Sequence, residues 1–425
     1  MKEFEGKKLL VLGGFSLACD IITHAQAMGA YVIVVDYNEN VPGVKVADKF
    51  FKISVLDIDA VVDLGIKEKI DGVATGFVDI LLEPCFEICK RLGLHCYFTP
   101  KMLSMSMSKL DFKNTCNEYN IPVPQTYLVG ESISEEVYDK IQYPVFVKPL
   151  DSSGSRGAGV CYCREEMIEQ FKRALSFSPT NNAVIEDYLT GREFLLNYIA
   201  VNGEYRLVSM FDRYVCADRG GAINYANLAM SPSKSIIKYL DYVNDKVIAM
   251  FKSLGFFDGL FFLQGYSDGA KITFFEMGCR LGGSYYNLEK ACVNLDPVDM
   301  IVRYAFTGKM MNDIEKVPVN VADYDMNAIC INYLLQDREA TIGKMCGIDE
   351  CIQLSSYVAH EQRQFVGDHY SNEKTVDRPA FSIYLAEKSF EQAVKDVKYL
   401  NEHFMVFDDK GEYLLKEKFD LETIY

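Results

Sequence analysis

A lysine that ends an apolar stretch and is followed by glycine and serine is the first pattern that could do chemistry. Lys148 closes the run that begins at Val145, and residues 152–157 read Ser-Ser-Gly-Ser-Arg-Gly. Glycines let backbone N–H groups converge on a phosphate. The lysine adds a charged hydrogen bond worth about 1.5–3 kcal/mol. The loop lacks the Gly-Lys pair of a Walker loop. We predict phosphate binding here, and a solvated hairpin loop is the alternative interpretation.

A second pattern places acidic residues at the end of an apolar strand. Val184 and Ile185 lead into Glu186 and Asp187, and Glu193 follows after a short turn. The backbone of an exposed strand end can hydrogen bond to the edge of an adenine base, and carboxylates accept hydrogen bonds from ribose hydroxyls. An ordinary surface hairpin with solvated acids is the alternative.

A third pattern combines a carboxylate with an arginine in a glycine-rich turn. Glu276 ends the apolar run that starts at Ile272, and Arg280 follows four residues later, ahead of Gly282 and Gly283. Mg²⁺ prefers hard oxygen ligands beside the phosphates that it bridges. Arginine offers a planar fork for a carboxylate or a phosphate. A purely structural Glu–Arg pair would give the same pattern.

In this order and spacing the three patterns resemble the ATP-grasp superfamily, in the style of biotin carboxylase, the carbamoyl-phosphate synthetase large chain and bacterial amino-acid ligases. The resemblance covers nearly the whole chain. It implies ATP and Mg²⁺ as cofactors, with Mn²⁺ as a substitute ion. It also implies a ligase that activates a carboxylate as an acyl phosphate, passes the acyl group to an amine, and releases ADP and phosphate.

The resemblance also assigns ATP-binding roles. Lys109 matches the first nucleotide lysine, which reaches the α-phosphate, and Lys148 matches the second. The flap over the β- and γ-phosphates corresponds to Ser152, Ser153, Gly154, Ser155 and Gly157. The adenine hinge corresponds to Glu186, Asp187, Tyr188 and Leu189. Glu193 matches the acid that binds the ribose.

For catalysis the resemblance points to Arg280, which would steady the acyl phosphate or the incoming carboxylate, together with Lys148. Glu276 matches the second metal carboxylate, but the position of the first carboxylate holds Gln264. The usual Glu-x-Asn-x-Arg has Gly278 in place of the asparagine. One carboxylate instead of two predicts weaker metal binding. These departures leave open a nucleotide-binding pseudoenzyme with a regulatory role. A carboxyphosphate-forming carboxylase is a second alternative, because the resemblance covers enzymes of this fold that make carboxyphosphate.

The elements that position these residues suggest a multidomain α/β and α+β fold. Residues 1–100 read as a doubly wound α/β domain, with strands at 8–14, 31–36 and 71–75 and helices at 16–28 and 80–92. Strands that alternate with helices make parallel sheets. By the resemblance this is the pre-grasp domain.

Residues 101–315 correspond to the ATP-grasp domain. We expect helices at 108–119, 240–254 and 291–306. Strands at 259–266 and 271–277 should pair around the Asp-Gly turn at Asp268. Residues 316–425 form a small mixed α+β domain with a late helix at 389–403.

The composition of the chain limits the classes of partner that it is expected to bind. The formal net charge is −16 and no basic arm is present, so we expect no binding to nucleic acid or to membranes. No secretion signal or membrane-length apolar run appears, which suggests a cytoplasmic protein. The substrates would be a small carboxylate and an amine, and a homodimer is the default expectation. The 13 cysteines include no CxxC pair. Cys85 and Cys89 suit one face of a helix, and this spacing does not predict a zinc site.

Overall fold

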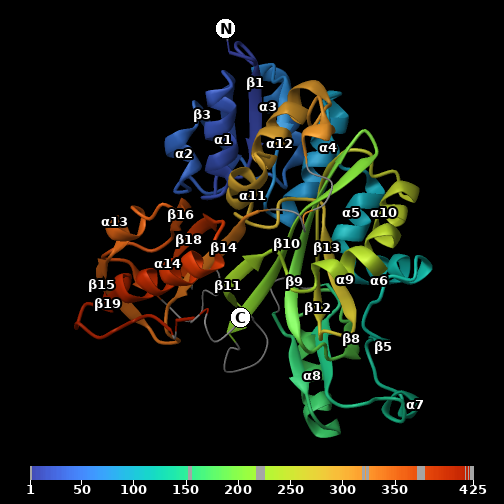
Figure 1. Cartoon of the computed structure of the whole chain (residues 1–425). Coiled ribbons are helices and arrows are strands. Elements are labelled where there is room, and N and C mark those ends of the chain that lie inside the picture. The colour runs from blue at the N-terminus through green and yellow to red at the C-terminus, as the bar shows by residue number, and fades with distance from the viewer. Residues whose placement is uncertain are drawn as a thin grey trace.

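The computed structural model describes most of the chain around one long antiparallel sheet (Figure 1). The described residues are 2–151, 156–216, 225–317, 321, 325–370, 379–416, 418, 419 and 421. A parallel sheet near the N-terminus and a small antiparallel sheet flank the long sheet at opposite ends of the view in Figure 1. This arrangement confirms the expected multidomain mixture of α/β and α+β structure.

The N-terminal part is a four-stranded parallel sheet in the order β3-β2-β1-β4. Its strands are nearly continuous apolar runs because helices cover the sheet. The strands are β1 (Lys8–Leu12), β2 (Tyr31–Asp36), β3 (Lys49–Lys52) and β4 (Gly72–Ala74). The helices are α1 (Ala18–Ala27), α2 (Gly43–Val46), α3 (Ile58–Glu68), η1 (Asp79–Leu81) and α4 (Leu82–Leu92).

Two capped helices connect this part to the rest of the chain. α5 (Pro100–Met107) begins at Thr99, whose side chain accepts a hydrogen bond from the Met102 N–H. α6 (Lys109–Glu118) begins at Ser108, whose hydroxyl accepts one from the Asp111 N–H at 3.1 Å. A hydroxyl at this position satisfies a backbone donor that lacks a partner within the helix. The helix predicted at 108–119 is confirmed.

A small antiparallel sheet in the order β5-β8-β6-β7 presents Lys148 and Glu186. α8 covers it through a compact core that includes Val147, Phe171 and Ile185. The strands are β5 (Thr126–Gly130), β6 (Val145–Pro149), β7 (Gly159–Cys161) and β8 (Ala183–Asp187). The helices are α7 (Glu135–Tyr138) and α8 (Arg164–Ser176).

The long sheet has the order β13-β12-β9-β10-β11-β14-β18-β16, and each neighbouring pair is antiparallel. Its first five strands are β9 (Arg192–Val201), β10 (Glu204–Cys216), β11 (Tyr225–Ser231), β12 (Gly259–Ser267) and β13 (Ile272–Gly278). The other three are β14 (Asn327–Leu334), β16 (Tyr357–Gln362) and β18 (Pro379–Glu387). The predicted C-terminal domain therefore continues the sheet of the predicted grasp domain, and the division at residue 316 stays a prediction.

The C-terminal part adds a second core beneath α14 (Phe390–His403). A three-stranded sheet in the order β17-β15-β19 lies beside it. The remaining elements there are β15 (Ala340–Cys346), α13 (Ile348–Cys351), β17 (His369–Tyr370) and β19 (Met405–Asp408). The helix predicted at 389–403 is confirmed, with Ser389 as its cap.

Two helices predicted as continuous are each divided. Residues 236–253 form α9 (Ile236–Tyr242) and α10 (Asn244–Ser253), because the backbone leaves the helical region at Val243. Residues 286–307 form α11 (Tyr286–Val293) and α12 (Pro297–Thr307). Asn294 takes the left-handed conformation, and the Asp296 side chain then caps α12. Apolar periodicity continued across both breaks, which is why it predicted single helices.

α12 carries the chain back onto the N-terminal sheet, where it packs against α1 and β4. The approach is close, because a Cβ at Gly72 would lie 2.7 Å from the Ala305 carbonyl oxygen. A short η2 (Ile314–Lys316) follows. Residues of the N-terminal sheet and of β9, β12 and α12 share one hydrophobic core.

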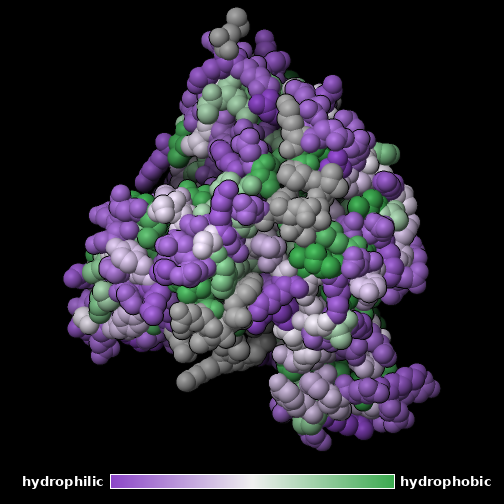
Figure 2. All heavy atoms as spheres, in the orientation of Figure 1, coloured by the Kyte–Doolittle hydropathy of each residue, from purple (hydrophilic) through white to green (hydrophobic). Residues whose placement is uncertain are grey.

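The surface carries no broad apolar patch on the face that Figure 2 shows, where hydrophobic side chains appear in small separate areas. Among the described residues, none of the helices combines the length and the apolar character that a bilayer crossing requires.

Candidate functional site

A buried carboxylate between two lysines forms the centre of the site. Lys148 near the end of β6 places its Nζ 2.5 Å from Glu186 Oε1 on the neighbouring strand β8. Lys113 of α6 contacts the other carboxylate oxygen of Glu186. Glu186 is 3% exposed. Burial raises the pKa of Glu186, but the two ammonium groups outweigh that effect and hold it below its usual range. The carboxylate is therefore ionised and fixes both lysines.

Sequence reasoning assigned Lys148 and Lys109 but missed Lys113. Lys113 lies one helical turn after Lys109 on α6 and also donates to Thr126 Oγ1 at 3.1 Å. The four-residue spacing of two lysines on one helix face was the available signal. Burial lowers the pKa of Lys109 and of Lys113, and repulsion from Lys148 adds to it.

Glu276 joins this group because the charges of Lys109 and Lys148 act on its carboxylate. Three ammonium groups thus stand near two carboxylates, Glu186 and Glu276. Ammonium groups gathered in this way could bind the phosphates of a polyphosphate. Burial raises the pKa of Glu276, against the opposing effect of Lys109 and Arg280. A bound cation would favour its ionised form in the same way.

The two candidate metal ligands are direct cross-strand neighbours. Gln264 on β12 pairs with Glu276 on β13, and the register shifts by one residue immediately beside them. Directly opposed residues in an antiparallel pair have Cβ atoms about 4.5–5.5 Å apart, so both side chains lie on one face. One carboxylate and one amide oxygen fit Mg²⁺, which keeps several waters and uses few protein ligands.

Packing explains why position 278 holds a glycine. A Cβ at Gly278 would lie 2.1 Å from Cε1 of Phe262, which is 3% exposed. The Phe262 ring therefore fills the space that an asparagine side chain would need. The Arg280 guanidinium also stacks over this ring, 4.8 Å from its centroid. The departure from Glu-x-Asn-x-Arg is thus matched by an aromatic residue on the neighbouring strand.

Arg280 is held by a carboxylate from the N-terminal part of the chain. Its Nε and Nη2 donate to the two oxygens of Asp79, at 2.6 and 2.7 Å, and its Nη1 donates to the Leu281 carbonyl at 2.9 Å. This bidentate geometry is the one in which arginine binds carboxylates. Sequence reasoning missed Asp79, which is 201 residues away along the chain.

Of the residues expected near adenine and ribose, two carboxylates pair with other side chains, and two further residues lie at the end of β8. Asp187 accepts hydrogen bonds from the Tyr127 hydroxyl (2.8 Å) and the Gln125 N–H (3.2 Å), and Glu193 pairs with Arg213 and Tyr266. These two carboxylates therefore have protein partners. Tyr188 is exposed and Leu189 is half-buried at the end of β8. Their contacts with a nucleotide stay predictions.

Most of the predicted flap, comprising Ser152, Ser153, Gly154 and Ser155, lies outside the described residues. Gly157 is described, and it has φ +75°. A Cβ at Gly157 would lie 2.7 Å from the Phe177 side chain, so both conformation and space require glycine there. Its carbonyl accepts a hydrogen bond from Gln170 Nε2 at 2.7 Å, which fixes the end of the flap against α8.

A small pocket adjoins Arg280 and contains a second buried carboxyl group. Glu289 of α11 lines this pocket and accepts a hydrogen bond from Ser209 Oγ at 2.7 Å. Ser209 in turn accepts one from Asn197 at 2.8 Å. Burial raises the pKa of Glu289 to about 7. No sequence signal distinguished Glu289 from the other acids on helices.

Comparison with known proteins finds a family model that matches part of the chain and solved structures of similar fold. Residues 108–201 match the family model described as carbamoyl-phosphate synthase L chain, ATP binding domain. The structure resembles an L-amino acid ligase from Bacillus licheniformis, with a TM-score of 0.76, 15% identity, and coverage of 95% of this chain and 99% of that one. These findings show a match to an ATP-binding domain over residues 108–201 and a shared fold over nearly the whole chain.

A second solved structure shows a similar fold. The biotin carboxylase domain of 2-oxoglutarate carboxylase from Hydrogenobacter thermophilus, solved with magnesium ADP and bicarbonate, has a TM-score of 0.77. Its identity is 16%, and the match covers 96% of this chain and 91% of that domain.

Among curated relatives, a formate-dependent phosphoribosylglycinamide formyltransferase from Sulfurisphaera tokodaii is 25% identical over 284 residues, 65% of this chain and 71% of the relative. A protein of the same name from Ignicoccus hospitalis is 27% identical over 188 residues, 43% of this chain and 46% of the relative.

Proposed function

We propose that this chain is an ATP-dependent ligase that phosphorylates a carboxylate and transfers the acyl group to an amine, with release of ADP and phosphate. The observation that carries the proposal is the pair of buried lysines, Lys113 and Lys148, on the buried carboxylate of Glu186, with the half-buried Lys109 near them. The relatives named for amino-acid ligation and for formate-dependent formyl transfer support the same reaction class.

In this proposal the lysines bind the phosphates of ATP, and Glu186 holds two of them in place before the nucleotide arrives. Gln264 and Glu276 would hold Mg²⁺, which supplies charge neutralisation at the phosphates when bound. Because phosphoryl transfer depends mainly on positioning and electrostatics, prepositioned ammonium groups lower the barrier.

Arg280 would bind the activated carboxylate. Both oxygens of Asp79 already pair with the Arg280 guanidinium, and this contact orients the guanidinium beside the pocket. An incoming carboxylate would share or replace Asp79 on the same nitrogen atoms.

Glu289 would accept the proton that the amine loses when it attacks the acyl phosphate. A general base works best when its pKa is near the operating pH, and burial has raised the pKa of Glu289 to about 7. The carboxyl group lines the same pocket as Arg280, so the acid and the amine would meet between these two residues.

The test measures ADP and phosphate release from ATP and Mg²⁺, with formate, amino acids and other small acids offered singly and in pairs with amines. We expect turnover that requires one acid and one amine together. A separate assay with bicarbonate tests carboxylase chemistry. Turnover that requires bicarbonate alone would reject the proposed ligase activity. Nucleotide binding without turnover across the whole set would instead favour a regulatory pseudoenzyme.

A further inference from the structure

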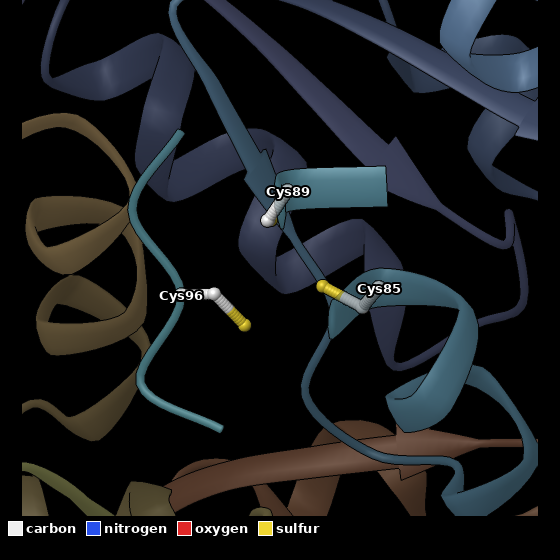
Figure 3. A group of neighbouring side chains, drawn as sticks. All are labelled: Cys85, Cys89 and Cys96. Atoms are coloured by element: carbon white, nitrogen blue, oxygen red, sulfur yellow. The ribbon is translucent and has the colours of Figure 1, made fainter. Parts of the chain in front are cut away.

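Three cysteine sulfurs converge beneath the N-terminal sheet, away from the proposed ATP site. Cys85 and Cys89 lie four residues apart on one face of α4, and Cys96 lies in the segment that follows (Figure 3). In Figure 3 the sulfur atoms of Cys85 and Cys96 point toward each other across the space between the helix and that segment. All three Sγ atoms lie within 4.8 Å of one another.

The helix end creates this convergence. α4 ends at Gly93, which has φ +67°, and the Leu94 N–H then donates to the Cys89 carbonyl at 2.9 Å. A left-handed residue at this position reverses the chain, and glycine adopts it without strain. The reversal carries Cys96 back along the helix face that holds the other two cysteines. Spacing along the sequence does not predict this contact.

The separation of the sulfurs matches a metal site. With Zn–S bonds of about 2.3 Å, sulfurs around a tetrahedral ion lie about 3.8 Å apart. Because all three sulfurs lie within 4.8 Å of one another, no pair exceeds that value by more than about 1 Å. Cys85 and Cys89 are 3% and 1% exposed, and Cys96 is half-buried. A cation could therefore enter from the side of Cys96.

We propose that Cys85, Cys89 and Cys96 form a binding site for one Zn²⁺ ion, with solvent as the fourth ligand. Thiolates are soft ligands that select Zn²⁺ and Cu⁺ over Mg²⁺. Three thiolates with Zn²⁺ leave a net charge of −1, whereas Cu⁺ would leave −2, and the more negative charge costs more in a buried site. The site is distinct from the predicted Mg²⁺ ligands in position and in ligand type.

The site also has a structural connection to the catalytic turn. Tyr97, the next residue after Cys96, is buried and donates its hydroxyl to the Cys279 carbonyl at 3.1 Å. Cys279 immediately precedes Arg280. An ion on Cys96 would therefore fix the segment that supports the backbone next to the catalytic arginine.

The experiment titrates the reduced chain with Zn²⁺ against a chromophoric chelator, and separately with Co²⁺ while thiolate-to-cobalt absorption is recorded. We expect one ion per chain and a charge-transfer band. Cys96→Ala should weaken Zn²⁺ binding by more than roughly a hundredfold, because it removes one of three protein ligands. Cys96 is the safest position to change, because its side chain is the least buried of the three.

Cys346→Ala, at another half-buried cysteine, is the matched control and should leave affinity and absorption unchanged. Thermal unfolding supplies an independent measurement: Zn²⁺ should raise the Tm of the unmodified chain and of Cys346→Ala, but not of Cys96→Ala. Equal Zn²⁺ affinity in the unmodified chain and in Cys96→Ala, or no ion uptake by the unmodified chain, would overturn the proposal. Tighter binding of Cu⁺ than of Zn²⁺ in the same competition would reject the assignment of the ion.

Discussion

At the scale of single residues, the site depends on charges buried together. Glu186 is almost fully enclosed and contacts both Lys113 and Lys148. A buried carboxylate of this kind is stable only because it is paired, and loss of one partner leaves a charge poorly compensated. The proposed binding of phosphate by the lysines would therefore be coupled at Glu186 to the stability of the folded chain.

We expect Lys148→Ala to reduce turnover by more than roughly a hundredfold and to weaken ATP binding, because a charged contact to the phosphates is lost. Steady-state kinetics and calorimetric titration with ATP measure both effects. Lys172→Ala, at an exposed lysine of α8, is the control and should behave like the unmodified chain. Near-normal activity of Lys148→Ala would reject the site assignment.

Glu289 makes stability depend on pH. The folded protein keeps its proton up to a pKa of about 7, whereas the ordinary value is 4.5. Between these values the folded state binds more protons than the unfolded state, so rising pH lowers the free energy of unfolding. Across the full interval between the two pKa values, the free energy of unfolding falls by about 3 kcal/mol. Glu289→Gln should therefore gain stability relative to the unmodified chain as pH rises from about 5 to about 8.

Urea unfolding at several pH values measures this difference. Glu169→Gln, at an exposed carboxyl of α8, should show no comparable trend. A stability difference between Glu289→Gln and the unmodified chain that stays constant with pH would show that Glu289 is not the buried proton carrier.

At the scale of elements, the hairpin of β12 and β13 positions the two proposed metal ligands. Its register places Gln264 opposite Glu276, and the adjacent bulge alters the twist of the strands at that point. Two residues further along β13, Gly278 has no side chain, and the Phe262 ring of β12 occupies the space beside it. The packing of either strand is therefore explained only together with the other.

Gly278→Ala should destabilise the fold by about 1–3 kcal/mol, because the new methyl group overlaps the buried Phe262 ring. The cost should be smaller in a Phe262→Ala background, where that ring is absent. Urea unfolding of the four variants in this double-mutant cycle gives the coupling free energy. Gly130→Ala is the control, because a Cβ there meets its nearest neighbour at 3.7 Å. Equal costs in both backgrounds would contradict the packing explanation.

At the scale of the whole molecule, the N-terminal sheet and the long sheet are joined at two places. α12 packs on the N-terminal sheet within a shared hydrophobic core. The Asp79–Arg280 pair bridges the same two parts through η1 and the turn after β13. The second contact is small and partly exposed, so its contribution concerns orientation of Arg280 more than stability.

We expect Asp79→Asn to lower kcat/KM by roughly tenfold, because the bidentate contact that orients Arg280 is lost. The free energy of unfolding should change by less than about 1 kcal/mol, since partly exposed ion pairs contribute little. Kinetics and urea unfolding on the same preparations separate the two effects. Asp59→Asn removes a carboxylate that pairs with Arg91 at the surface and should leave kcat/KM unchanged. Equal kinetic losses in both variants would argue against a role for Asp79 in positioning.

The sequence alone determined the features that depend on local pattern. Apolar runs that alternate with helices predicted the parallel N-terminal sheet, and Asp268-Gly269 predicted the hairpin that carries Glu276. Lys148 at a strand end indicated phosphate binding because its neighbours along the chain supply the loop. Helix boundaries inside 236–307 were less accurate, since capping at Asp296 competes with continuous apolar periodicity.

Only the tertiary structure decided which distant residues meet. Glu186 lies between two lysines because β6 and α6 converge on β8, and Arg280 meets Asp79 across 201 residues of chain. Phe262 explains Gly278 only once β12 and β13 are paired. Local propensity acts over a few residues, whereas these contacts arise from burial that the whole chain satisfies together. The pattern of residues thus indicated the chemistry, and packing determined the partner of each charge.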